Sequence, residues 1–230
     1  MRLIPIQLGF PARSHRGYLG LSSAYLVLAQ KVVLYDTLGF NERENLPSRL
    51  TEVGIAPQHV SVVILSHLHF DHAANVDLFP WAEVIVHKHE LEHATQVAEE
   101  PWRDPACFYS LLTQLKKMSL RVVEKEEEFL PGLRLLHLPG HTPGLLGLEV
   151  AGMGALVSDA IKSRFDLVGP PAPPCWNPTA AMQSRERLLG YPRLYPGHDV
   201  PLRREGKSFI PDGKAELGIL LGEGETWLTL

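Results

Sequence analysis

Three histidines and one aspartate crowd into the six residues from 67 to 72. Neutral imidazole and carboxylate are ligands that Zn²⁺ and similar divalent ions prefer in proteins. Without a metal, these groups in one tight turn would each need a separate hydrogen-bond partner. The segment therefore predicts a metal site, and its candidate ligands are His67, His69, Asp71 and His72.

Three later segments present further metal-capable residues. His141 lies within the Pro- and Gly-rich segment 139–144, Asp159 lies in 157–160, and His198 lies in 196–199. Glycine and proline beside His141 and His198 let the backbone turn sharply and restrict the loops. With the first segment there are seven candidates, which is more than one tetrahedral ion can bind. Two ions that share one bridging carboxylate would use all of them.

Each candidate ligand follows a segment with the pattern of a strand. The strands predicted before the ligands are 60–65, 133–138, 155–157 and 193–195; others are 3–8, 24–28, 31–35, 84–86, 120–124 and 145–150. Helices are predicted over 44–53, near 73–78, within 88–119 with breaks at Pro101 and Pro105, and over 179–189. This mixture predicts an α/β fold, in which polar residues at strand ends build the site.

The bulk properties favour one domain over residues 1–230. The chain is 45% hydrophobic, which suffices for a full core, while residues 201–230 predict no definite element except a strand near 227–230. The net charge of −4 predicts no nucleic-acid partner. Two cysteines cannot build a disulfide framework, and the N-terminus lacks a signal-peptide pattern. No stretch reaches about 18 uninterrupted apolar residues, so no membrane span is predicted. We therefore expect a cytoplasmic protein with a small-molecule partner.

The ordered motifs resemble those of the metallo-β-lactamase superfamily. The resemblance covers about residues 1–200 and includes Asp36-Thr37, which is similar to the family's Asp-Thr-Gly element with Leu38 in place of glycine. It implies a four-layer αββα sandwich. It also implies one ion on His67, His69 and His141, a second on Asp71, His72 and His198, a bridging Asp159, and an Asp36 that orients ligands.

The chemistry implied is metal-assisted hydrolysis by a hydroxide that bridges two divalent ions. Zinc is the expected metal, and iron or manganese would also suit nitrogen and oxygen ligands. Asp71 is the candidate catalytic residue, because its carboxylate can orient the nucleophile and move a proton.

Within the superfamily, residues 65–73 are most similar to the acyl-homoserine lactonases, and the segment around His141 also resembles glyoxalase II. Three positions depart from the lactonase pattern: Ala74 and Asn75 stand in place of a Gly pair, and Lys162 stands in place of a tyrosine that contacts the substrate. We therefore expect a hydrolase of a small ester, thioester or lactone. Lys162 is a possible contact for an acidic substrate group, and the segments 88–119 and 163–178 flank the metal loops.

Two alternatives remain open at this point. One is a persulfide-dioxygenase-like oxidoreductase with a single iron on His67, His141 and Asp159. The other is a metal-stabilised binding module without activity. Three further histidines, His87, His89 and His93, are expected at the surface or at a helix start, outside the site.

Overall fold

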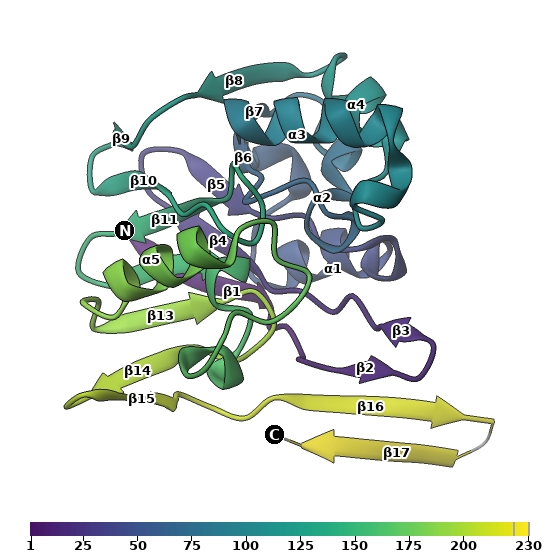
Figure 1. Ribbon diagram of the computed structural model, residues 1–230. Coiled ribbons are helices and arrows are strands. Elements are labelled where there is room, and N and C mark those ends of the chain that lie inside the picture. The colour runs from purple at the N-terminus through teal and green to yellow at the C-terminus, as the bar shows by residue number, and fades with distance from the viewer. Residues whose placement is uncertain (223, 230) are drawn as a thin grey trace.

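Two mixed β-sheets dominate the computed structural model, which describes residues 1–222 and 224–229 (Figure 1). The first sheet has the order β1-β4-β5-β6-β7-β8, with strands Arg2–Gln7, Ala24–Leu28, Val32–Tyr35, Val62–Ile64, Glu83–His87 and Ser119–Val123. The second has the order β15-β14-β13-β12-β11-β10-β9; from β9 to β15 its strands are Glu127–Leu130, Leu133–His137, Leu146–Val150, Gly154–Ser158, Arg193–Pro196, Leu202–Glu205 and Ser208–Pro211.

Side chains from the first sheet enter two different cores because successive residues of a strand point to opposite faces. In β4, Leu26 joins the core that also holds Leu46 and Leu50, whereas Tyr25 and Val27 join a core shared with the second sheet. A sheet buried on both faces needs a layer on each side. The four-layer αββα arrangement supplies these layers, as expected.

The helices form the outer layers of this sandwich. On the first sheet lie α1 (Asn45–Glu52), α3 (Lys88–Glu99) and α4 (Tyr109–Leu115), and on the second lies α5 (Pro178–Leu188). The predicted helix near 73–78 is instead α2 (Phe70–Ala73) followed by a 3₁₀ turn at Val76–Leu78. Between the two, Asn75 donates its side-chain amide to the carbonyls of Thr37 and Gly39.

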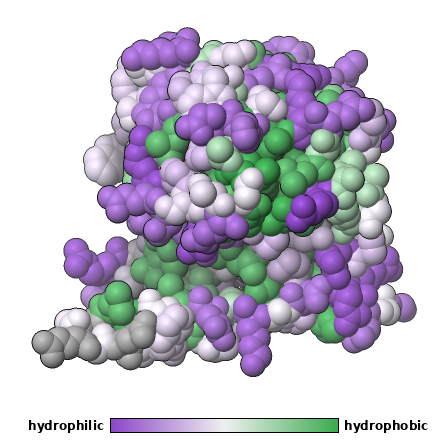
Figure 2. Space-filling view, turned by 180° about the vertical axis from the view of Figure 1, so that it is seen from behind, coloured by the Kyte–Doolittle hydropathy of each residue, from purple (hydrophilic) through white to green (hydrophobic). Residues whose placement is uncertain are grey.

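The C-terminal region contains more strands than its sequence predicts. It supplies β14 and β15 to the second sheet, followed by the hairpin β16 (Glu216–Leu221) and β17 (Gly224–Thr229). The strand predicted near 227–230 is confirmed over Trp227–Thr229, and residue 230 lies outside the described part of the chain. The hairpin projects beyond the body in both views (Figures 1 and 2).

A smaller hairpin, β2 (Arg13–Ser14) with β3 (Gly17–Tyr18), leaves the body between β1 and β4. Strand β9 was not predicted, because its Glu-Glu-Phe-Leu sequence has little apolar alternation. None of the helices in the described residues is long and apolar enough to cross a bilayer.

Candidate metal centre

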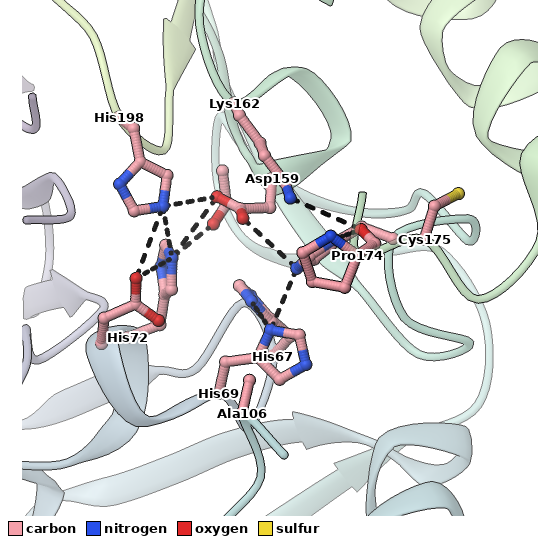
Figure 3. A network of polar contacts seen from close by, with 12 residues as sticks. His67, His69, His72, Ala106, Asp159, Lys162, Pro174, Cys175 and His198 are labelled. Carbon is pink, nitrogen blue, oxygen red and sulfur yellow. Dashed lines mark hydrogen bonds and ion pairs between the residues drawn. The ribbon is translucent and has the colours of Figure 1, made fainter. Parts of the chain in front are cut away.

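The ligand-bearing loops leave the ends of strands in both sheets and converge on one point (Figure 3). His67, His69, Asp71 and His72 follow β6 of the first sheet. His141, Asp159 and His198 follow β10, β12 and β13 of the second sheet. Strands β5 to β8 are parallel, and so are β12 and β13, so the loops after them emerge on the same side of each sheet.

The first group of candidate ligands contains three histidines. His69 Nδ1 lies 3.1 Å from His67 Nε2 and 3.0 Å from His141 Nε2. His141 Nε2 also lies 3.2 Å from Asp159 Oδ2. Four ligand atoms therefore surround one point.

The second group lies on the other side of Asp159. His72 Nε2 and His198 Nε2 are 3.4 Å apart, and they lie 3.4 Å and 3.3 Å from Asp159 Oδ1. Asp71 Oδ2 completes the group at 3.5 Å from His198 Nε2. The two oxygens of Asp159 thus face different groups.

These distances fit the donor set of a metal ion. With ligand bonds of 2.0–2.1 Å, neighbouring ligands on a tetrahedron lie about 3.3 Å apart. Asp159 Oδ1 is buried and has no hydrogen-bond partner among the described residues, which would be costly unless a cation faced it. Both groups could therefore hold an ion, and Asp159 is placed to serve both.

Each of the five candidate ligand histidines has an inner ring nitrogen that faces the other ligands and an outer one that faces away. The outer nitrogen is hydrogen-bonded to an oxygen in every case. The pairs are His67 Nδ1 with Ser66 Oγ (2.9 Å), His69 Nε2 with Asp104 Oδ2 (3.0 Å), His72 Nδ1 with Asp36 Oδ2 (2.9 Å), His141 Nδ1 with Pro174 O (2.8 Å) and His198 Nδ1 with Leu21 O (2.9 Å). Each outer nitrogen donates in these bonds, so the inner nitrogen keeps a lone pair for a metal.

The electrostatics of the metal-free site favour the protonation states that metal binding needs at His67, His141 and Asp159. Burial alone would lower the pKa values of His72 and His198, but the nearby Asp159 outweighs it and raises both, so an ion in the second group must displace protons. Burial and the neighbouring His72 and His69 hold the pKa of His67 well below its usual range, so this imidazole is neutral. Burial alone would raise the pKa of Asp159, but the surrounding histidines, His198 first, outweigh it and hold that pKa well below its usual range.

Asp36 occupies the position that its predicted orienting role requires. Its carboxylate accepts bonds from Ser66 N (2.7 Å) and Ser66 Oγ (2.8 Å) in addition to His72 Nδ1. Both Asp36 (φ 61°) and Leu38 (φ 62°) have left-handed backbone. Glycine would adopt this conformation without strain, whereas Leu38 also fills the core between the first sheet and α1.

Asp104 and His93 belong to the site although their positions carry no sequence signal. Asp104 Oδ2 accepts from both His69 Nε2 and His93 Nε2 at 3.0 Å. The expectation that His93 lies at the surface is wrong, because it is buried against Asp104. Only the fold brings α3 and the loop after it against the candidate ligand His69.

His87 was also expected at the surface or at a helix start, and the surface alternative is wrong. It is completely buried, caps α3 by accepting from His89 N, and stacks on His137 with ring centres 4.1 Å apart. His89 is exposed in the first turn of α3, as expected.

A cavity of about 530 Å³ opens over both groups. Its lining includes Asp71 and Lys162 as well as apolar residues from three segments of the chain: Phe10, Phe70, Phe165 and Pro173. The segment 163–178 therefore forms part of its wall, and the segment 88–119 contributes Ala106. By contrast, Arg164 binds the buried carboxylate of Asp199, which explains both residues structurally.

The comparisons with known proteins agree with this architecture. A sequence model of the metallo-β-lactamase superfamily matches residues 17–198. The chain is 33% identical over 179 residues to an N-acyl homoserine lactonase of Bacillus sp, covering 73% of this chain and 67% of the relative. It is 36% identical over 186 residues to the N-acyl homoserine lactonase AiiB of Agrobacterium fabrum, covering 65% of this chain and 66% of AiiB.

Solved structures give the same result. The crystal structure of a quorum-quenching N-acyl homoserine lactone hydrolase is similar with a TM-score of 0.60 at 26% identity, covering 73% of each chain. AidC, a dizinc quorum-quenching lactonase, shares the fold with a TM-score of 0.67 at 22% identity, covering 84% of this chain and 80% of AidC. With its match over residues 17–198, the chain belongs to the metallo-β-lactamase superfamily of metal-dependent hydrolases.

Proposed function

We propose that this protein is a dinuclear metal-dependent hydrolase of a small ester, thioester or lactone. The observation that carries the proposal is Asp159, whose two oxygens face separate histidine groups in a site that can hold two ions. His67, His69 and His141 would hold one ion, and Asp71, His72 and His198 the other. Zinc is the proposed metal because imidazole and carboxylate ligands in near-tetrahedral groups suit it.

When bound, such ions polarise a carbonyl oxygen and make a nearby water acidic near neutral pH. The chain's own residues orient the reaction. Asp71 lines the cavity, where its carboxylate would align the attacking water and take up its proton. The apolar walls at Phe10, Phe70 and Phe165 would hold the carbon chain of the substrate and exclude bulk water.

We further propose that Lys162 contacts a negatively charged group of the substrate. Lys162 Nζ donates to the carbonyls of Pro173 (3.2 Å) and Pro174 (3.4 Å) at the cavity wall. An ammonium group has three donors, so one remains for a ligand. The lactonase relatives are named for N-acyl homoserine lactones, which carry no charge. An anionic substrate would distinguish this protein from them.

The test begins with metal quantification on protein prepared without chelators, followed by a panel of esters, thioesters, lactones and phosphodiesters. Two ions per chain and hydrolysis of a carbonyl substrate are the expected results. A single tightly bound iron, with oxygen uptake in the presence of glutathione persulfide, would instead establish the oxygenase alternative.

Lys162→Met tests the substrate contact within the same panel. For a substrate with a carboxylate beside the scissile bond, KM should rise about tenfold with kcat nearly unchanged, because a charge-assisted bond is lost from binding alone. A neutral analogue is the control and should show wild-type KM. Equal effects on both substrates would contradict the assigned contact.

A further inference from the structure

Glu90 is a fully buried carboxylate that the hydrolytic mechanism does not use. It lies in the first turn of α3, outside every sequence motif that contributes a candidate ligand. Acidic residues are almost never fully buried unless they are paired. Its hydrogen bonds therefore require an explanation.

The two oxygens of Glu90 bind two different ligand loops. Oε1 accepts from Leu68 N at 3.1 Å, and this amide lies between His67 and His69. Oε2 accepts from Gly144 N at 3.0 Å, three residues after His141. One loop follows β6 in the first sheet and the other follows β10 in the second. A single carboxylate thus connects the loops that carry the first histidine group.

The loop that contains Gly144 packs tightly against Glu90. A Cβ added to Gly144 would lie 2.3 Å from Glu90 N and 2.8 Å from Glu90 Cβ. The second loop therefore rests directly on the backbone of α3, and only glycine allows this approach. Its position relative to the first loop is set from both sides, since Leu146 N also donates to Ser66 O at 2.8 Å.

We propose that Glu90 is a positioning residue that holds the loops of His67, His69 and His141 at the separation that one metal ion requires. It acts through the backbone of Leu68 and Gly144 and does not touch the metal or the substrate. The inference rests on the proposed function only in assuming that these histidines bind an ion. Partners beyond the direct ligands typically change metal affinity 10–100-fold when they are removed.

Glu90→Gln is the appropriate variant because it preserves the size of the side chain. An amide offers one oxygen and one NH₂ group, so one of the two backbone N–H groups would face another donor. The matched control is Glu92→Gln, an exposed glutamate on the same helix that pairs with His89. Zinc affinity is measured by competition with a chromophoric chelator, and ligand geometry by the visible spectrum of the cobalt-substituted protein.

We expect Glu90→Gln to weaken one of the two zinc sites 10–100-fold and to alter the cobalt spectrum, while Glu92→Gln stays within twofold of the wild type. Urea unfolding of the metal-free proteins measures the stability cost separately. If Glu90→Gln fails to fold, Glu90→Asp keeps the charge but shortens the side chain, so its carboxylate cannot reach both amides, and it should weaken the same site.

Wild-type affinity and an unchanged cobalt spectrum in folded Glu90→Gln would overturn the proposal, as would a loss of metal-free stability with no change in metal affinity. These outcomes are distinct from a failure of the proposed function. A wild-type protein that binds two ions and hydrolyses no member of the panel would refute the function and leave the role of Glu90 intact.

Discussion

Among the single residues of the site, Asp71 has two proposed roles, as a metal ligand and as the proton acceptor. Its Oδ2 lies near His198 Nε2, and the residue also lines the cavity. Both roles depend on the carboxylate rather than on packing. Replacing the Asp71 carboxylate therefore tests the chemical role of this residue without disturbing the fold.

Asp71→Ala should lower kcat at least about 100-fold, because general acid–base groups typically contribute 10²–10⁴. Far-UV circular dichroism should remain that of the wild type. Asp77→Ala, which removes a partly exposed carboxylate paired with Arg43, is the control and should keep its rate. A metal-loaded Asp71→Ala protein with undiminished kcat would remove this residue from the mechanism.

Leu38 shows that a departure from the family pattern can have a local cause. Its left-handed backbone costs about 1–2 kcal/mol, which a glycine would not incur. Its fully buried side chain contributes more than that, because truncating a buried leucine costs about 2–5 kcal/mol. The packing term is the larger of the two.

Leu38→Gly should therefore destabilise the protein by about 2 kcal/mol, although it restores the family's glycine and relieves the strain. Urea unfolding of the metal-free protein gives this value directly. A more stable Leu38→Gly variant would mean that backbone strain outweighs the packing of this side chain.

Among the secondary-structure elements, helix α3 contacts several parts of the site through its first turn. Its cap residue His87 is buried beside His137 and His89, and burial is the main cause that lowers its pKa from 6.5 to about 4. The unfolded chain takes up this proton near pH 6.5, and the folded chain only near pH 4. The unfolded state thus binds more protons in this window, and the free energy of unfolding decreases as the pH falls through it.

His87→Asn should remove this dependence while keeping the cap, because asparagine is a favoured N-cap residue. Between pH 7 and pH 4.5, the wild type should lose about 1–2 kcal/mol more stability than the variant. Urea unfolding with a chelator present keeps metal release out of the measurement. His59→Asn, at an exposed histidine, should follow the wild-type curve; parallel curves for all three proteins would refute the assignment.

At the scale of the whole molecule, the proposed ions join the two sheets. One set of ligands follows β6 in the first sheet, and the others follow β10, β12 and β13 in the second. An ion that binds only the folded chain stabilises it by about 4 kcal/mol at a thousand times its dissociation constant. Metal binding should therefore stabilise the sandwich as a unit, as the predicted single domain requires.

Removing the metal with a chelator should lower Tm by about 8–16 °C, since each kcal/mol corresponds to 2–4 °C for a chain of this size. Calorimetry with and without added zinc measures the shift, and one cooperative transition is expected in both cases. An identical Tm in both conditions would show that the ions do not connect the sheets. Two separate transitions would contradict the single domain.

The sequence by itself determined the elements that carry ligands and the identity of the seven candidates. Strand and helix patterns are local, and a dense run such as residues 67–72 has few explanations besides a metal. Local patterns did not predict β9, β14 or β15, where apolar alternation is weak. Their pairing depends on neighbouring strands.

Only the tertiary structure decided which residues lie against the candidate ligands and their loops. Asp104, His93 and Glu90 lie in or near α3, between two ligand motifs in sequence, and nothing in their spacing connects them to His69 or Gly144. Orienting a ligand requires a hydrogen bond at about 3 Å, and such bonds form between segments that only the packing of helix on sheet brings together. The candidate ligands can therefore be identified from the sequence, whereas the residues that hydrogen-bond to them come together only in the folded protein.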